Sequence, residues 1–214
     1  MTDLRYTLVS DGSSDQALLP LISWSLRGGG VVSPIRPAWA DLSGLRQRPS
    51  GLKERIRAAL SYYPCELLLV HRDCETQEVA TRQNEIRIAL DEVFGSSSER
   101  IPAVCVVPRR MTEAWLLISE RAIRMAAGNP SGRTPLLMPV LNRLEDLPDP
   151  KEVLFSLFRT ASELHGRRLR SLRVRGLIYR LVELIDDFSP LRNLPAFVAF
   201  EQQLGEALQQ IDAE

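Results

Sequence analysis

The sequence is poor in cysteine and lysine and carries no net charge. Its three cysteines, Cys65, Cys74 and Cys105, are odd in number and widely spaced, which argues against a disulfide framework. The only lysines are Lys53 and Lys151, so nearly all positive charge comes from arginine. The 27 basic and 27 acidic residues balance, which argues against the global basic field that marks many nucleic-acid-binding proteins.

Long hydrophobic runs and glycine-rich nucleotide loops are also missing. No apolar run approaches the roughly 18 residues that a membrane span requires. The first residues lack the basic and apolar stretches of a secretory signal. Neither a G-x-G-x-x-G fingerprint nor a P-loop is present. With 44% hydrophobic and 25% charged residues, the sequence favours a globular cytoplasmic protein that does not enter a membrane.

Strand-like runs alternate with amphipathic helical patterns four times in the first 128 residues. Such alternation predicts a mostly parallel sheet with helices on both faces. The continuous apolar run at 65–70 predicts a strand that is covered on both faces. Two prolines make the second run irregular or an edge strand. The predicted strands are residues 5–10, 31–40, 65–70 and 101–108, and the predicted helices are 15–26, 50–63, 76–94 and 112–127.

The pattern changes after residue 128. A loop rich in proline, glycine and serine is followed by helical segments, without a further buried strand. We therefore expect an α/β domain over residues 1–128 and a helical C-terminal region over 129–214, packed on the domain or beside it. The predicted helical segments lie near 136–145, 150–164, 168–187 and 195–211.

Acidic residues follow three of the predicted strands. Asp11 and Asp15 follow the first strand, Asp73 and Glu75 the third, and Glu113 opens the helix after the fourth. Ligands of parallel α/β sheets bind outside the carboxyl ends of the strands, so these carboxylates are candidates for one site. In an extended D-x-E segment the two side chains point the same way, and Asp73 and Glu75 can then share a metal ion. Carboxylate oxygens suit Mg²⁺, which activates water in phosphoryl chemistry.

Each acid also has a simpler interpretation. Asp11 and Asp15 stand beside two serines and fit a turn and helix cap. Asp73 and Glu75 fit a solvated loop. Glu113 fits a residue that complements a helix dipole. Only their joint position favours a functional site. Cys74 is a poor nucleophile, because two neighbouring acids disfavour its thiolate.

The motifs Asp11-Gly12-Ser13-Ser14-Asp15 and Asp73-Cys74-Glu75 resemble those of the Toprim domain family. That family has E-G-x-x-D after its first strand and D-x-D after its third. The stretch VPRRMTEAWLL (107–117) resembles an E-x-W-L element of small bacterial Toprim-like proteins of uncharacterised function. Residues 150–154 and 191–204 are also similar to that group, so the resemblance covers most of the chain.

The resemblance implies Mg²⁺-dependent or Mn²⁺-dependent phosphodiester chemistry. It implies an acid/base or metal-directing role for Asp11 and metal binding by Asp73 and Glu75. We expect Asp15 at the same metal site and treat Glu113, which matches the smaller group alone, as a candidate catalytic residue. Such proteins are often encoded beside ATPases in bacterial defence loci, which implies a nuclease effector or a partner of an ATPase.

One segment is rich in arginine although the chain as a whole is neutral. It is an amphipathic helical pattern whose leucines share an apolar face, so the arginines are either a solvated face or contacts to nucleic-acid phosphates. The candidate nucleic-acid-binding residues are Arg167, Arg168, Arg170, Arg173 and Arg175.

Two hypotheses follow from the sequence. The first is a metal-dependent nuclease that uses Asp11, Asp73 and Glu75. The second is a noncatalytic Toprim-like partner that binds an ATPase or nucleic acid. It is motivated by the neutral charge and by two departures from the family pattern, aspartate at Asp11 and glutamate at Glu75.

Overall fold

The computed structural model describes residues 3–95 and 100–213, and its centre is a parallel sheet of four strands. The strands lie in the order β2-β1-β3-β4, which confirms the predicted α/β fold. Leu8 of β1 pairs with Trp39 of β2 on one side and with Leu69 of β3 on the other. The proline-containing strand is at the edge, as predicted. The strands are β1 (Leu4–Val9), β2 (Ile35–Trp39), β3 (Leu67–His71) and β4 (Ala103–Val106).

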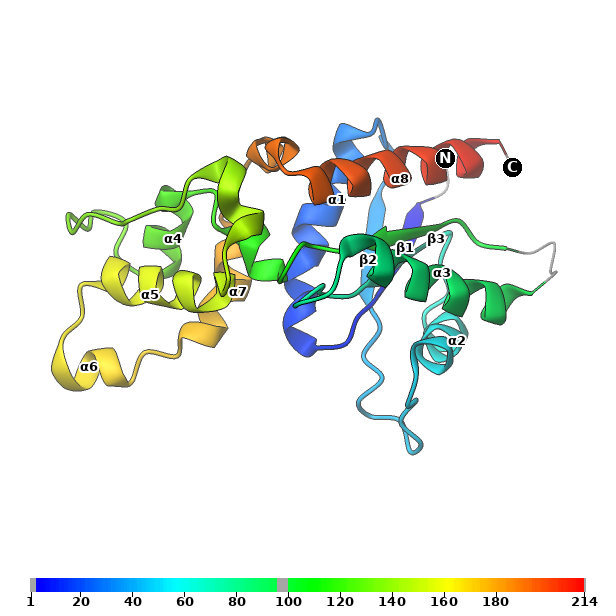
Figure 1. Cartoon of the computed structure of the whole chain (residues 1–214), viewed down its shortest axis with the longest axis horizontal. Coiled ribbons are helices and arrows are strands. Elements are labelled where there is room, and N and C mark those ends of the chain that lie inside the picture. Colours follow the sequence, from blue (N-terminus) through cyan, green and yellow to red (C-terminus); the bar gives the residue numbers. More distant parts are fainter. Residues whose placement is uncertain (1–2, 96–99, 214) are drawn as a thin grey trace.

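Helices cover both faces of the sheet (Figure 1). Alternate residues of β3 explain why its sequence is apolar throughout: Leu67 and Leu69 belong to one hydrophobic cluster, and Leu68 and Val70 to the other. The first cluster includes α1 (Leu19–Gly28) and α8 (Pro195–Asp212), and the second includes α2 (Leu52–Tyr62) and α3 (Val79–Phe94).

The helices between β4 and η4 (Ser189–Asn193) form a second lobe, which we call the helical lobe (residues 112–183). It begins with the 3₁₀ helix η2 (Thr112–Leu116), and in Figure 1 it lies on the side of the sheet opposite the two termini. Its core is continuous with the core on one face of the sheet. The ring of the fully buried Trp115 packs edge-on against Phe197 of α8, with 5.3 Å between the ring centroids. Its other elements are α4 (Glu120–Ala126), η3 (Leu141–Asp146), α5 (Pro150–Ser162), α6 (Gly166–Arg170) and α7 (Val174–Glu183).

Four predicted helices differ from the structure. The predicted helix 15–26 consists of the 3₁₀ helix η1 (Ser13–Leu18) and of α1, which has Pro20 in its first turn. The predicted helix 112–127 is split, because the Ser119 side chain accepts the Ala122 N–H and starts α4 anew. The predicted helix 168–187 is split where the Ser171 hydroxyl donates to the Arg168 carbonyl in place of the helix ladder. The predicted segment 136–145 is helical only in η3, since Pro139 disfavours helical backbone before it.

Among residues 3–95 and 100–213, no helix has the length and apolar character of a membrane span. After α7 the chain crosses back through η4 (Ser189–Asn193) into α8, which packs on β4. The cores on the two sides of residue 128 are therefore continuous.

Candidate functional site at the carboxyl edge

The carboxyl ends of the strands face the helical lobe. The chain order reverses between β1 and β3, which makes this point the topological switch where open α/β sheets bind ligands. The 3₁₀ helix η1 (Ser13–Leu18) follows β1 and packs on α7, and η2 follows β4 and packs on α5. Figure 1 shows the helical lobe beyond this edge of the sheet. Acids after β1 and β3 thus lie between two lobes.

His71, the last residue of β3, is the buried centre of this edge, with 2% of its surface exposed. Its Nδ1 lies 3.4 Å from Oδ2 of Asp15, and its Nε2 lies 3.3 Å from Oδ1 of Asp73. Thr112 joins the group: its Oγ1 is 2.9 Å from Nε2 of His71, and its backbone N–H donates to Asp73 Oδ1 at 2.9 Å. The Gly12 N–H donates to Asp15 Oδ2 at 2.9 Å. Asp15 and Asp73 therefore flank one imidazole.

The two carboxylates keep this imidazole charged. Burial by itself lowers the pKa of His71, but hydrogen bonding and charge from Asp15 and Asp73 outweigh it and raise the pKa to about 9. Burial likewise raises the pKa of Asp15, and its contact with His71 reverses the sign, so that pKa is lowered. At neutral pH the group is an Asp–His⁺–Asp arrangement. Sequence reasoning missed it; the signal was a histidine ending an otherwise apolar strand beside acids.

Asp11 is held by two arginines rather than left open. Arg55 of α2 forms an ion pair with Asp11 Oδ1 and also donates to the Ser10 carbonyl. Nε of Arg72 lies 3.2 Å from Asp11 Oδ2. About half of the Asp11 side chain is exposed, so the ion pairs lie at the surface. Asp11 is therefore a charge-neutralised acid in this arrangement.

The backbone at Glu75 is not extended, so the condition under which Asp73 and Glu75 point the same way is not met, and metal binding by Glu75 stays a prediction. The backbone of Glu75 is left-handed, with φ of 53°, because its N–H donates to the Arg110 carbonyl at 2.8 Å in a turn. Its carboxylate faces solvent and lies 3.9 Å from Arg82. The extended D-x-E geometry required for two side chains on one metal ion is absent.

Glu113 is buried and belongs to a different pair. Only 5% of its surface is exposed, and Nζ of Lys151, near the start of α5, lies 3.3 Å from its Oε1. The pair ties η2 to α5. The catalytic role of Glu113 stays a prediction.

The acids as placed do not fit a preformed Mg²⁺ site. Within residues 3–95 and 100–213, no group of three or more His, Cys, Asp and Glu side chains is arranged to hold a metal ion. Arginines contact both carboxylate oxygens of Asp11. Oδ2 of Asp15 is contacted by His71 and by the Gly12 N–H, and the Glu75 carboxylate faces solvent. Mg²⁺ binding would require Asp11 to leave its arginines.

Cys74 is buried between the two acids of its motif. Burial is the main cause that raises the pKa of its thiol to about 11, and the nearby Arg82 opposes the shift only in part. The thiol therefore stays protonated at neutral pH, which agrees with its exclusion as a nucleophile.

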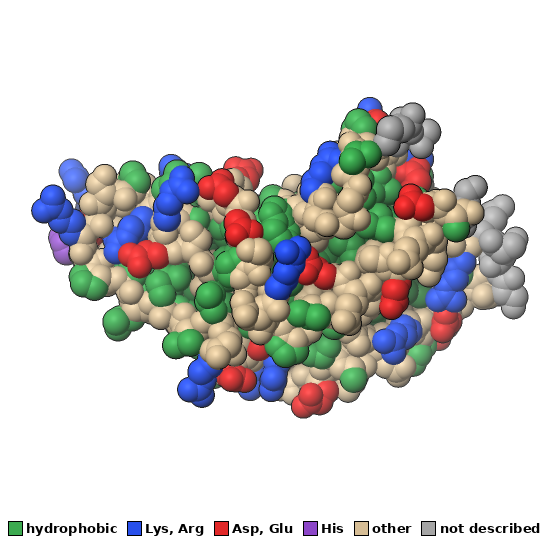
Figure 2. All heavy atoms as spheres, turned by 90° about the horizontal axis from the view of Figure 1, so that it is seen from above, with side chains coloured by type: hydrophobic (Ala, Val, Ile, Leu, Met, Phe, Trp, Pro, Cys, Tyr) green, Lys and Arg blue, Asp and Glu red, His purple; other side chains and the backbone are tan. Residues whose placement is uncertain are grey.

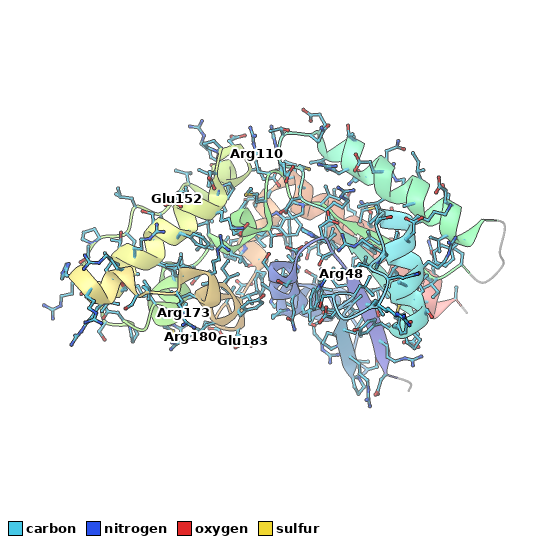
Figure 3. The ribbon with its side chains drawn as sticks, turned by 90° about the horizontal axis from the view of Figure 1, so that it is seen from below. Arg48, Arg110, Glu152, Arg173, Arg180 and Glu183 are labelled. Atoms are coloured by element: carbon cyan, nitrogen blue, oxygen red, sulfur yellow. The ribbon has the colours of Figure 1, made fainter. Side chains whose placement is uncertain are left out.

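The candidate arginines lie on α6, on α7 and between them, and all are exposed. In the part of the chain that the structure describes, none forms an ion pair with an acid. Ile178 and Leu181 on the opposite side of α7 are buried, so the amphipathic pattern is also real. Figure 2 shows basic side chains at the outer end of the helical lobe, and Figure 3 shows Arg173 and Arg180 on one side of it, with Arg48 on the sheet lobe.

Comparisons with protein-family models, with curated proteins and with solved structures found no match. The Toprim resemblance therefore stays an expectation that rests on the short motifs at Asp11–Asp15 and Asp73–Glu75. What the structure adds is a class: an α/β protein with a helical lobe over the carboxyl edge of a parallel sheet.

Proposed function

We propose that this chain is a noncatalytic, Toprim-like binding protein whose helical lobe holds nucleic acid through its arginines. The observation that carries the proposal is charge distribution. Residues 165–180 contain six arginines and no acid, whereas the whole chain is neutral. Exposed guanidinium groups without acidic partners are free to contact phosphates, which supply most nonspecific affinity for nucleic acid.

The state of the acids supports the same proposal. Asp11, Asp15 and Glu75 each lie beside a cation from the chain itself, so the carboxyl edge does not repel a phosphate as five free carboxylates would. A solvated amphipathic surface is the competing interpretation of the arginines, and it predicts no measurable binding.

A titration of labelled single-stranded and double-stranded DNA and RNA tests this function. We expect binding whose affinity falls steeply with salt, because each phosphate contact releases a counterion. Fluorescence anisotropy at several salt concentrations gives both affinity and slope. Absence of binding to all four nucleic acids at low salt contradicts the proposal.

A metal-dependent nuclease is the second candidate, favoured by Asp73. Every polar contact of Asp73 within the described ranges uses Oδ1, so Oδ2 is open, at the end of β3 beside the strand that carries Asp11. One or two carboxylates with water and substrate phosphate are the usual Mg²⁺ ligands. If Asp11 leaves Arg55 and Arg72 when substrate binds, the two acids can complete such a set.

Comparing Asp73→Asn with wild type, for nucleic-acid cleavage and for melting temperature, separates the noncatalytic function from the nuclease. Neither protein should cleave DNA or RNA with Mg²⁺ or Mn²⁺, and metal should not shift the wild-type melting temperature, because a ligand stabilises only a state that it binds. Cleavage, or a melting shift, that is present in wild type and lost in Asp73→Asn supports the nuclease instead.

The partner ATPase implied by the resemblance also stays a prediction. Co-purification of the chain with the ATPase encoded beside it, where one exists, is the measurement that checks it.

A further inference from the structure

A pocket of about 320 Å³ lies between the turn after β1 and helix α7. Three separate parts of the chain line it: the start of η1, the start of α5 and the first turns of α7. Tyr179 connects α7 to the turn after β1, because its hydroxyl donates a hydrogen bond to the Ser13 carbonyl at 2.9 Å. The lining of the pocket includes Ser13, Ser14, Lys151, Arg175, Gly176 and Tyr179.

The charge of this pocket is positive. Lys151 and Arg175 are the charged residues that line it, and no acid does. Arg175 forms no ion pair within the described ranges. Lys151 has one acidic partner, the buried Glu113, which leaves part of its ammonium group for a ligand since lysine has three N–H donors. One buried carboxylate against two cations leaves a net positive charge.

The pocket also offers hydroxyl donors and open space. Ser13 and Ser14 are exposed and carry hydroxyl groups at its rim, although the Ser14 hydroxyl also lies 3.4 Å from Asp15 Oδ1. Gly176 contributes no side chain, and a Cβ at this position would meet no atom within 4 Å. The pocket thus presents two cations and two hydroxyl groups around an open volume. Arginine and lysine are the side chains that most often bind phosphate, and hydroxyl groups can donate to its oxygens.

The position of the pocket indicates which phosphate it takes. On one side α7 continues from the exposed arginines of α6. On the other side Ser13 also lines a second hollow of about 520 Å³ at the carboxyl ends of β1 and β2. A chain of phosphates that runs from α6 to the carboxyl edge therefore passes this pocket.

We propose that the pocket between the β1 turn and α7 binds one backbone phosphate of a nucleic-acid strand, through Lys151, Arg175 and the hydroxyls of Ser13 and Ser14. This site rests on the proposed function and deepens it, since it fixes the path of the strand from the arginines of α6 to the carboxyl edge of the sheet.

Two substitutions test the site without disturbing the core. Arg175→Ala removes an exposed cation. Gly176→Glu adds a carboxylate in open space, and Gly176→Gln adds a side chain of the same size without charge. Glycine is a poor helix former, so both Gly176 variants should fold at least as well as wild type. Arg57→Ala on α2, also exposed and without an ion pair in the described ranges, is the matched control for lost positive charge.

We expect Arg175→Ala and Gly176→Glu to weaken binding of a labelled single strand by roughly fivefold to tenfold, with a salt slope that is smaller by about 0.7 for Arg175→Ala. Gly176→Gln and Arg57→Ala should stay within about twofold of wild type. If wild type binds and both pocket variants bind as tightly, the site is overturned while the proposed function stands. If wild type binds no strand, the proposed function itself fails.

Inorganic phosphate and a nucleoside monophosphate form the second arm. A melting shift with either compound that depends on Arg175, together with strand affinity that does not, overturns the strand assignment and identifies a pocket for a small phosphate compound. Strand affinity that depends on Arg175, with no such melting shift, supports the assignment.

Discussion

Replacing His71 with glutamine should lower the free energy of unfolding by about 3 kcal/mol at pH 7, because it leaves two carboxylates without their shared buried cation. The imidazole is 2% exposed and contacts Asp15 and Asp73 on opposite sides. Glutamine keeps hydrogen-bonding groups but brings no charge. Urea unfolding of the two proteins measures the difference. A loss under about 1 kcal/mol contradicts the Asp–His⁺–Asp arrangement, since that is the scale of an ordinary hydrogen bond.

The same group makes stability depend on pH in a defined direction. The pKa of His71 is about 9 in the folded protein and near 6.5 when unfolded, so the folded state binds the proton more tightly. Its contribution is complete below pH 6.5 and is lost as pH rises through 9. The pKa of Asp15 is shifted downward, so its contribution is lost as pH falls below the ordinary aspartate range. Wild type should weaken between pH 6.5 and 9, and His71→Gln should lack this loss.

A double-mutant cycle separates this charge effect from packing. Asp15→Asn removes one carboxylate and keeps the size of the side chain. If His71 and Asp15 interact through charge, the two substitutions together destabilise the fold by less than the sum of their separate effects. Strict additivity shows that His71 and Asp15 do not interact through charge, and the same cycle with Asp73→Asn tests the other carboxylate.

We expect alanine at Arg167, Arg168 and Arg170 to weaken binding to a single strand by on the order of 100-fold at low salt, since each lost phosphate contact carries a charge-assisted hydrogen bond. These residues lie on α6 at the outer end of the helical lobe. No residue of α6 is buried, so their replacement should not disturb the core. The slope of log affinity against log salt should fall by about 2, or about 0.7 for each contact. Anisotropy titrations measure both quantities.

The control for this triple variant removes the same charge elsewhere. Arg27, Arg57 and Arg87 lie on α1, α2 and α3, they are exposed, and their side chains form no ion pair in the described ranges. Alanine at all three changes the net charge equally and should leave affinity within about threefold, because long-range attraction is screened beyond about 10 Å at moderate salt. Equal loss in both triple variants indicates a general charge effect and contradicts a surface on α6 and α7.

The sequence predicted the sheet well because buried strands have a direct signature. Residues 65–70 are apolar on both faces, and β3 is covered by helices on both faces. The topology then put Asp11 and Asp73 at adjacent strand ends, where the structure has them. The edge position of β2 was predictable because a proline has no backbone N–H to donate to a neighbouring strand.

The partners of the acids were not predictable in the same way. Arg55, which pairs with Asp11, comes from a helix 44 positions away, and no periodicity in the sequence assigns that contact. The left-handed backbone at Glu75 depends on the Arg110 carbonyl in another loop. The role of His71 was missed because strand periodicity treats a polar residue at a strand end as a boundary. Contacts between distant segments, rather than local patterns, determine these features.

Hydrogen exchange of the wild-type chain with and without a saturating single-stranded oligonucleotide shows where the strand lies on the protein. If the strand runs along the helical lobe to the carboxyl edge, exchange slows in peptides that cover Ser13–Leu18 and residues 166–180 and does not change in α2 and α3. Protection confined to α2 and α3, or no change anywhere at saturation, contradicts binding along the helical lobe to the carboxyl edge of the sheet.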